Sequence, residues 1–192
     1  MANIDSPFGL KPVQHRNGAP YNGAFRYYSV AAGYGTAIMI GDPVILAGSS
    51  QTIGGRIYSD VQRAATGDVF QGVCIGVVPV TADSLRYRAA STQRILMVAD
   101  DPDLVFEIQE VSGGTALAAA DAGLNADLVV AAGSTVTALS GVELDNSTEA
   151  TTNTLDLHII GPVNREDNEI GEHCKWLVTF NRHQFRNQVA GI

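Results

Sequence analysis

The densest group of carboxylates in the chain surrounds a single proline. Asp100 and Asp101 precede Pro102, and Asp103 follows it. Several oxygen ligands from one short loop are what a hard cation such as Ca²⁺ requires. Aspartate and proline are also the residues that favour a turn between two strands. We therefore predict a hairpin turn here, with a calcium site as the alternative.

A second acidic group lies towards the end of the sequence. It consists of Glu166, Asp167, Glu169 and Glu172. Closely spaced carboxylates are typical of a solvated loop. The alternative is an acidic docking patch for the basic segment of a partner.

Cysteine and histidine are the ligands that would suit zinc. Cys74 and Cys174, together with His173 or His158, could in principle supply them, but no CxxC or HxxxH spacing is present. His173 and Cys174 are adjacent, and adjacent residues of a strand point to opposite faces. The sequence therefore predicts no metal site, and we expect both cysteines to be free, buried and inert.

No set of residues predicts catalysis. The glycines of Gly33-Tyr34-Gly35 and Gly54-Gly55 lack the spacing, the lysine and the following helix of a phosphate-binding loop. Only two lysines occur, Lys11 and Lys175, which limits any Schiff-base chemistry. No nucleophile and base are spaced as a pair. We predict no catalytic residue and no cofactor, and we do not expect an enzyme.

The charges are unevenly distributed along the 192 residues. The net charge is −8, yet residues 1–26 and residues 182–192 are each basic by two charges. The segment between them carries 7 basic and 19 acidic residues. An acidic body repels phosphate backbones, so we expect no nucleic-acid partner. Basic ends on an acidic body suggest segments that dock on an acidic surface, either a second copy or a different protein.

The apolar runs are too short for a membrane. The longest, around residues 73–80, falls far short of the ~20 residues that a spanning helix needs. Residues 1–7 have neither the basic nor the apolar region of a secretory signal. We expect a protein made in a cytoplasm that has no membrane partner.

The first 26 residues are predicted to form an extended N-terminal arm. Prolines at positions 7, 12 and 20 oppose a helix, and glycines at 9, 18 and 23 interrupt any strand. Spaced apolar residues could anchor such an arm across neighbouring subunits, with basic residues setting its register. The alternative is a tail wrapped over its own domain. The residues predicted to contact a partner are Phe8, Leu10, Lys11, Arg16, Tyr21, Phe25, Arg182 and Arg186.

The remainder is predicted to be one β domain, residues 27–181, followed by a C-terminal tail, residues 182–192. Short alternating or apolar segments between turn residues indicate about eight strands. Gly72 and Gly76, inside one of these segments, are candidate bends where a sheet curls into a barrel. The predicted fold is all-β, a jelly-roll-like sandwich or a small tulip-like barrel, with at most one short helix.

Three local predictions follow from the pattern. Residues 91–99 and 104–111 should form a hairpin around the aspartate cluster, with one face of the second strand in solvent. The one helix should lie within residues 115–123, with Thr115 as its N-cap and Gly123 just after its end. Residues 132–154 are small, polar and irregular, so we expect a long surface excursion there.

Several segments resemble tailed-bacteriophage head proteins of the cement, or decoration, type. They are MANIDSPFGLKPV at residues 1–13, GAPYNG at 18–23, IGDPV at 40–44, GLNADL at 123–128, KWLV at 175–178 and NRHQ at 181–184. The resemblance covers most of the chain in patches, and none of the segments is a catalytic motif.

The resemblance implies a non-enzymatic virion protein on the outside of an assembled capsid. Proteins of this type are β-rich, form homodimers or homotrimers, and clamp adjoining subunits of the phage major capsid protein. Two alternatives stay open. One is another virion subunit, such as a major capsid or tail protein, although this chain is short and almost without helix. The other is a small β-barrel enzyme or ligand-binding module.

Overall fold

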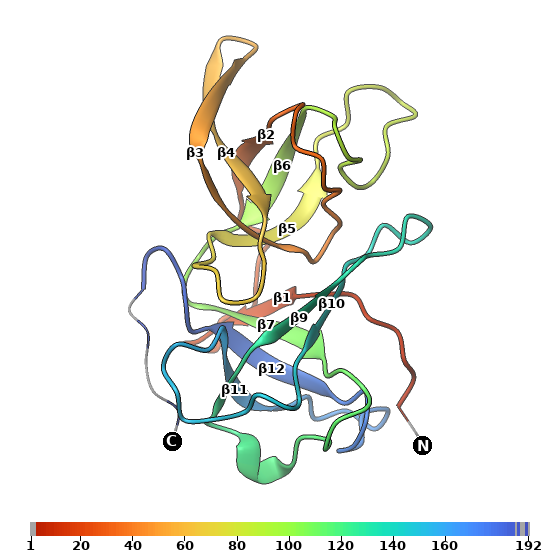
Figure 1. The fold of residues 1–192 in the computed structure, drawn as a ribbon, viewed down its shortest axis with the longest axis vertical. Coiled ribbons are helices and arrows are strands. Elements are labelled where there is room, and N and C mark those ends of the chain that lie inside the picture. Colours follow the sequence, from red (N-terminus) through yellow and green to blue (C-terminus); the bar gives the residue numbers. More distant parts are fainter. Residues whose placement is uncertain (1–2, 187, 189–190, 192) are drawn as a thin grey trace.

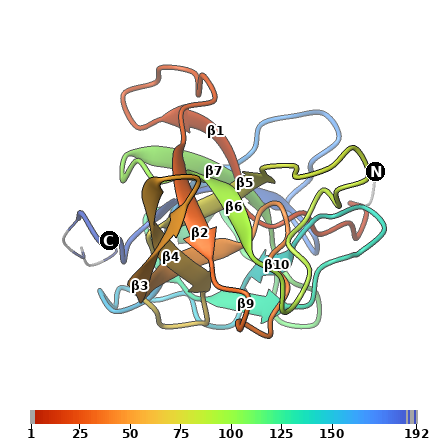
Figure 2. The same ribbon diagram turned by 90° about the horizontal axis from the view of Figure 1, so that it is seen from above.

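In the computed structural model, which describes residues 3–186, 188 and 191, the chain is almost entirely β-structure. Strands β2 (Arg26–Val30), β3 (Pro43–Ile53), β4 (Arg56–Arg63), β5 (Gly72–Val77) and β6 (Arg94–Ala99) close a barrel. This barrel lies above a separate sheet in Figure 1 and is seen from above in Figure 2. The all-β prediction, with its barrel alternative, is confirmed.

The second β body is a five-stranded antiparallel sheet. Its strands, in spatial order, are β1 (Lys11–His15), β7 (Leu104–Gln109), β12 (Lys175–Phe180), β11 (Leu157–Pro162) and β8 (Asn125–Ala126). A two-stranded hairpin of β9 (Leu128–Ala131) and β10 (Gly141–Leu144) packs beside it. The predicted single domain of residues 27–181 therefore contains two β bodies.

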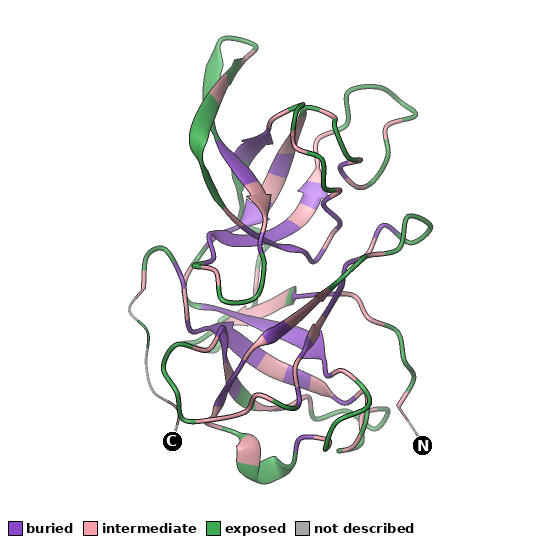
Figure 3. Cartoon of the chain, in the orientation of Figure 1, coloured by how far each residue is buried: buried purple, intermediate pink, exposed green. Residues whose placement is uncertain are grey.

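Each body has its own apolar core. In the sheet, Trp176, Phe106 and Phe180 are almost fully buried, and the Phe180 ring stacks on Phe70 at 4.7 Å between centroids. Figure 3 shows that buried residues lie along the strands of both bodies. The barrel core consists of Tyr28, Val30, Ile38, Val44, Val61, Cys74, Leu96 and Val98.

The two glycines of β5 do curve the barrel wall, as predicted. The pairing of β5 with β6 shifts register between Cys74 and Gly76. A Cβ on Gly72 would lie 2.4 Å from the Ala99 carbonyl oxygen, so only glycine permits this strand approach.

The predicted hairpin around the aspartate cluster is wrong. β6 pairs with β2 and β5 in the barrel, whereas β7 pairs with β1 and β12 in the sheet. Residues 100–103 therefore link the two bodies. Asp100 accepts a hydrogen bond from the Tyr28 hydroxyl at 2.7 Å, and Asp101 lies 3.2 Å from His15. These two carboxylates are used by different partners and do not converge as calcium ligands.

Strand β7 does not have the exposed face that its alternation predicts. All six of its residues are buried. The polar face is covered because the segment before β1 and the loop before β12 lie over it. Glu107 receives the Arg165 guanidinium at 2.9 Å, and the Gln109 side chain receives the Ser6 backbone N–H at 3.0 Å.

The predicted arm of residues 1–26 is also part of the folded body over its described residues. β1 pairs antiparallel with β7, and Leu10 is only 1 % exposed. Pro12 is tolerated because β1 is the edge strand, where a missing N–H costs no ladder bond. The Tyr21 N–H then donates to the Val13 carbonyl at 3.1 Å and turns the chain towards β2. The alternative of a tail wrapped over its own domain is the one observed.

The predicted helix is reduced to one 3₁₀ turn, η1 (Ala119–Asp121). Its cap is not Thr115: the Asp121 carboxylate accepts the Ala118 N–H at 2.8 Å. Gly123 has φ of +97°, which matches its predicted place after the helix. No described helix is both long and apolar enough to cross a membrane.

The expected irregular excursion of residues 132–154 contains strand β10. The alternating residues Val142 and Leu144 are buried in the sheet core. The strand was not predicted because the residues around it are small and polar. The C-terminal tail is attached at its start, where the Phe70 N–H donates to the Arg182 carbonyl at 3.0 Å. Residues 187, 189, 190 and 192 of the predicted tail lie outside the described residues.

Glu110, directly after β7, is a carboxyl group enclosed in the sheet core. It is 0 % exposed and accepts a hydrogen bond from the Trp176 indole N–H at 2.6 Å. Burial raises the pKa of Glu110 from 4.5 to about 7. Burial also raises the pKa of Asp156, to about 6. Both groups therefore bind a proton more tightly in the folded than in the unfolded chain.

This linkage predicts that the protein gains stability as the pH falls from 8 to 5, by up to about 3 kcal/mol for Glu110. The gain is complete below the unfolded pKa and is lost as the pH rises through the folded one. Glu110→Gln should flatten the profile and raise stability at pH 8 by about 1–2 kcal/mol. Urea unfolding at several pH values measures both effects. Glu166→Gln, on an exposed loop, is the matched control, and an equal change in both variants would contradict the assignment.

Candidate docking cleft between the barrel and the sheet

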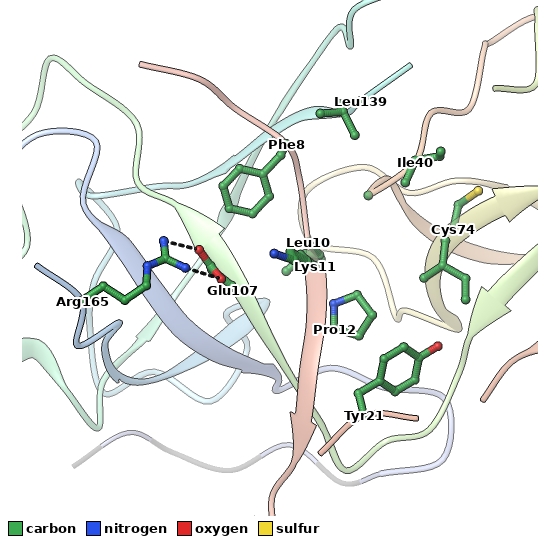
Figure 4. A pocket seen from close by; sticks show the side chains of 12 residues that line it. Phe8, Leu10, Lys11, Pro12, Tyr21, Ile40, Cys74, Glu107, Leu139 and Arg165 are labelled. Carbon is green, nitrogen blue, oxygen red and sulfur yellow. Dashed lines mark hydrogen bonds and ion pairs between the residues drawn. The ribbon is translucent and has the colours of Figure 1, made fainter. Parts of the chain in front are cut away.

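A cleft lies where the barrel meets the sheet. It has a volume of about 540 Å³, and its walls come from both bodies and from the segment between them (Figure 4). Ile40 and Cys74 lie on the barrel side, whereas Glu107 and Arg165 lie on the sheet side. The lining residues are Phe8, Leu10, Lys11, Pro12, Tyr21, Ile40, Gly41, Cys74, Ile75, Glu107, Leu139 and Arg165.

Two glycines are in close contact beside the cleft, and one of them, Gly41, lines it. The Leu10 N–H donates to the Gly41 carbonyl at 2.9 Å. Gly9 and Gly41 have φ of +74° and +93°, a region that favours glycine. A Cβ on Gly41 would lie 2.2 Å from the Phe8 carbonyl oxygen, and a Cβ on Gly9 would lie 2.4 Å from the Gly41 carbonyl oxygen. The segment before β1 can therefore lie against the barrel only because both residues lack side chains.

Asp42 holds the barrel side of this contact in place. It is 0 % exposed and accepts hydrogen bonds from the Met39 N–H at 2.7 Å and the Ser140 hydroxyl at 2.6 Å. Its carboxylate also pairs with Arg63 at 3.1 Å. Burial raises the pKa of Asp42, and the Arg63 charge opposes that rise. Asp42, directly before β3, is thus linked to β4 through Arg63 and to the loop before β10 through Ser140.

The sheet side of the cleft is charged. Arg165 donates to both carboxylate oxygens of Glu107, at 2.9 and 3.3 Å, and Lys11 lines the cleft beside them. Lys11 is exposed, whereas Glu107 is 5 % exposed. Arg165 also pairs with Asp167 at 3.3 Å, so the two cations on this side of the cleft are balanced by two carboxylates. An apolar molecule with a few polar groups would match this lining.

The cysteine in the cleft is not a nucleophile. Burial, with the Asp42 charge, raises the pKa of Cys74 to about 12. Burial and the Glu110 charge raise the pKa of Cys174 to about 11. Both thiols are free and buried, as the sequence predicts. Because the thiolate is the reactive form, the cleft is suited to binding and its cysteine to packing.

Four of the eight predicted partner residues meet in this cleft: Phe8, Leu10, Lys11 and Tyr21. Leu10 is almost fully buried in its own core, so it forms part of the floor. The sequence reasoning missed Glu107 and Arg165. Glu107 lies in β7 and Arg165 in the loop between β11 and β12, so no local sequence pattern predicts that they meet.

The other four predicted residues lie elsewhere. Arg16 is exposed near Asp103, to whose carbonyl its N–H donates at 2.8 Å. Phe25 is 38 % exposed and meets Tyr27 edge-on.

Arg182 and Arg186 make contacts within the chain. Arg182 donates to the Thr154 carbonyl at 3.2 Å, and Arg186 donates to the Pro102 and Phe180 carbonyls at 3.4 Å. The structure therefore uses both guanidinium groups to hold the start of the C-terminal segment against the body.

A second prominent surface feature is the β3–β4 ribbon. The distal parts of these strands, which meet at residues 50–59, extend beyond the barrel and are largely exposed (Figures 1 and 3). Ile57 is 75 % exposed on this ribbon. At its base, Asp60 accepts hydrogen bonds from the hydroxyls of Ser29 at 2.6 Å and Ser49 at 2.7 Å. These bonds fix the direction in which the ribbon projects.

Comparison of the chain with protein-family models, with curated proteins and with solved structures finds no match in any of the three.

The glycine contact can be tested with a matched pair of substitutions. Gly41→Ala should destabilise the protein by about 3 kcal/mol, because it adds a clash with Phe8 to the cost of a left-handed alanine. Gly48→Ala is the control, since Gly48 has φ of +75° but no atom within 4 Å of its added Cβ. It should cost only about 1 kcal/mol. Denaturant unfolding measures both, and equal losses would show that the close approach is unimportant.

Proposed function

We propose that the chain is a structural virion protein, a cement protein that binds the outside of an assembled phage capsid and clamps adjoining major capsid subunits. One observation carries this proposal. Two of the segments that resemble cement proteins, residues 1–13 and 40–44, are distant in sequence but touch through the Leu10–Gly41 hydrogen bond. The resemblance therefore includes a pair of segments that build one structural feature, the docking cleft.

The shape of the molecule supports a clamping role. A two-stranded ribbon alone is at best marginally stable in water, so a projecting one gains from contact with a partner. The distal parts of β3 and β4 pair only with each other, which leaves outer edges that could accept a further strand. Since residues 3–26 are folded against the body, the reaching element in this proposal is the ribbon and not the N-terminal segment.

Binding of the protein would be thermodynamically linked to the stability of the shell. A protein that binds the closed shell better than separated subunits stabilises the shell by that difference in affinity. Several weak contacts, made by a homodimer or homotrimer, would add up through effective concentration. A contact of standard size buries about 800 Å² on each partner.

A small ligand-binding module is the second candidate. The cleft volume of about 540 Å³ falls in the range of small-molecule sites, and its lining is apolar with a few charged groups. Under this alternative, an apolar molecule with a few polar groups would bind the isolated chain without any shell.

The cement proposal predicts that Ile57→Asp lowers binding to shells of the major capsid protein by roughly tenfold or more, because it places a charge on the contacting ribbon. Thermal stability should not change, since Ile57 is exposed. Ile170→Asp, at a 52 % exposed position on the loop between β11 and β12, is the matched control. Co-sedimentation with shells measures binding. Failure of the unaltered protein to bind shells, or equal binding by all three proteins, would count against the proposal.

A further inference from the structure

Three potential metal ligands meet at a point on the sheet outside the docking cleft. Asp5 comes from the segment before β1, Glu143 from β10 and His173 from the loop before β12. Their ligand atoms all lie within 4.8 Å of one another, and the Asp5 carboxylate is 3.7 Å from the His173 Nδ1 atom. Residues more than 130 positions apart in the sequence thus share one site.

The fully buried side chain of Gln109 organises this group. Its Nε2 atom lies 3.1 Å from Asp5 Oδ1, 2.9 Å from Glu143 Oε1 and 3.4 Å from His173 Nδ1. Its Oε1 atom accepts the Ser6 N–H at 3.0 Å, which fixes the direction of the amide. An amide nitrogen carries only two hydrogens, so it cannot serve three acceptors. The Gln109 amide can therefore donate to at most two of the three groups at once.

The surroundings of Glu143 shift its pKa. Burial raises the pKa of Glu143, the Asp5 charge adds to the rise, and His173 opposes it. Asp5 is exposed and Glu143 and His173 are partly buried, so a cation that joined the three groups would relieve the repulsion between the two carboxylates. A proton on His173 would relieve part of that repulsion, whereas a metal ion would contact all three groups.

We propose that Asp5, Glu143 and His173 bind a divalent first-row transition ion of the zinc type. The imidazole makes the difference, because calcium takes oxygen ligands, whereas zinc accepts nitrogen and oxygen together. Tetrahedral zinc with bonds of about 2.1 Å needs ligand atoms roughly 3.4 Å apart, so the group must contract by about 1 Å. The Asp5 side chain is 63 % exposed, which leaves room for that movement and for a water in the fourth position.

Such an ion would fasten the N-terminal segment to the sheet. Asn3 already donates to the Glu169 and Glu172 carbonyls, at 2.7 and 3.0 Å. Asp5 lies three residues before Phe8, which lines the docking cleft. Binding at Asp5 would therefore stabilise the segment that forms one wall of the cleft, whatever partner that cleft receives.

Titration of Zn²⁺ into the full-length chain, followed by calorimetry and thermal melting, tests the site. We expect one ion per chain and a higher melting temperature. Asp5→Asn should weaken binding by roughly tenfold or more, because it removes a charged ligand. Its melting temperature without zinc should remain that of the unaltered chain, since the side chain is exposed. His173→Gln and Glu143→Gln should weaken binding similarly.

His15→Gln is the matched control. His15 also faces an aspartate, Asp101, at 3.2 Å, but lacks the second carboxylate of the proposed site. This variant should bind zinc as tightly as the unaltered protein. Absence of stoichiometric binding, or binding that survives Asp5→Asn and His173→Gln but is lost in His15→Gln, would overturn the proposal. A zinc-induced shift of the His173 imidazole resonances would support it directly.

Discussion

The contact between Gly9 and Gly41 is the constraint on which the arrangement of the molecule depends. It brings two backbones together at a distance that no side chain permits, with the Leu10–Gly41 hydrogen bond across it. From this point the chain runs in one direction into β1 of the sheet and in the other into β3 of the barrel. The two β bodies therefore meet along a backbone contact, and the apolar cleft is the space that remains beside it.

Buried carboxylates affect this arrangement in two ways. Asp42 and Asp60 are each surrounded by several donors, so their hydrogen bonds determine the direction of neighbouring segments. Glu110 and Asp156 have less compensation, and burial raises their pKa values. The acidic character of the body is therefore partly internal. Its surface charge is lower than the composition suggests, which suits a protein that packs against a neighbour.

A clamp needs rigid parts and a reaching part, and the distribution of burial separates them. The N-terminal segment, with its prolines and spaced apolar residues, has the composition of an arm, yet over its described residues it is anchored to the sheet. The β3–β4 ribbon contains few apolar residues and projects from the barrel. In our proposal, the clamp is therefore a β-ribbon on a rigid two-body frame, and the cleft between the barrel and the sheet offers a second contact.

Composition and period-two alternation were enough to predict an all-β fold with a barrel, and two free, buried cysteines. These are local properties, because alternation, turn residues and thiol burial depend on near neighbours in sequence. The pairing of strands is not a local property. Nothing in residues 91–111 shows whether the two strands pair as a hairpin or belong to different β bodies. The cleft and the Asp5–Glu143–His173 group join residues separated by tens to more than a hundred positions. Only tertiary packing decides such meetings, since the free energy that creates them comes from burial shared by the whole core.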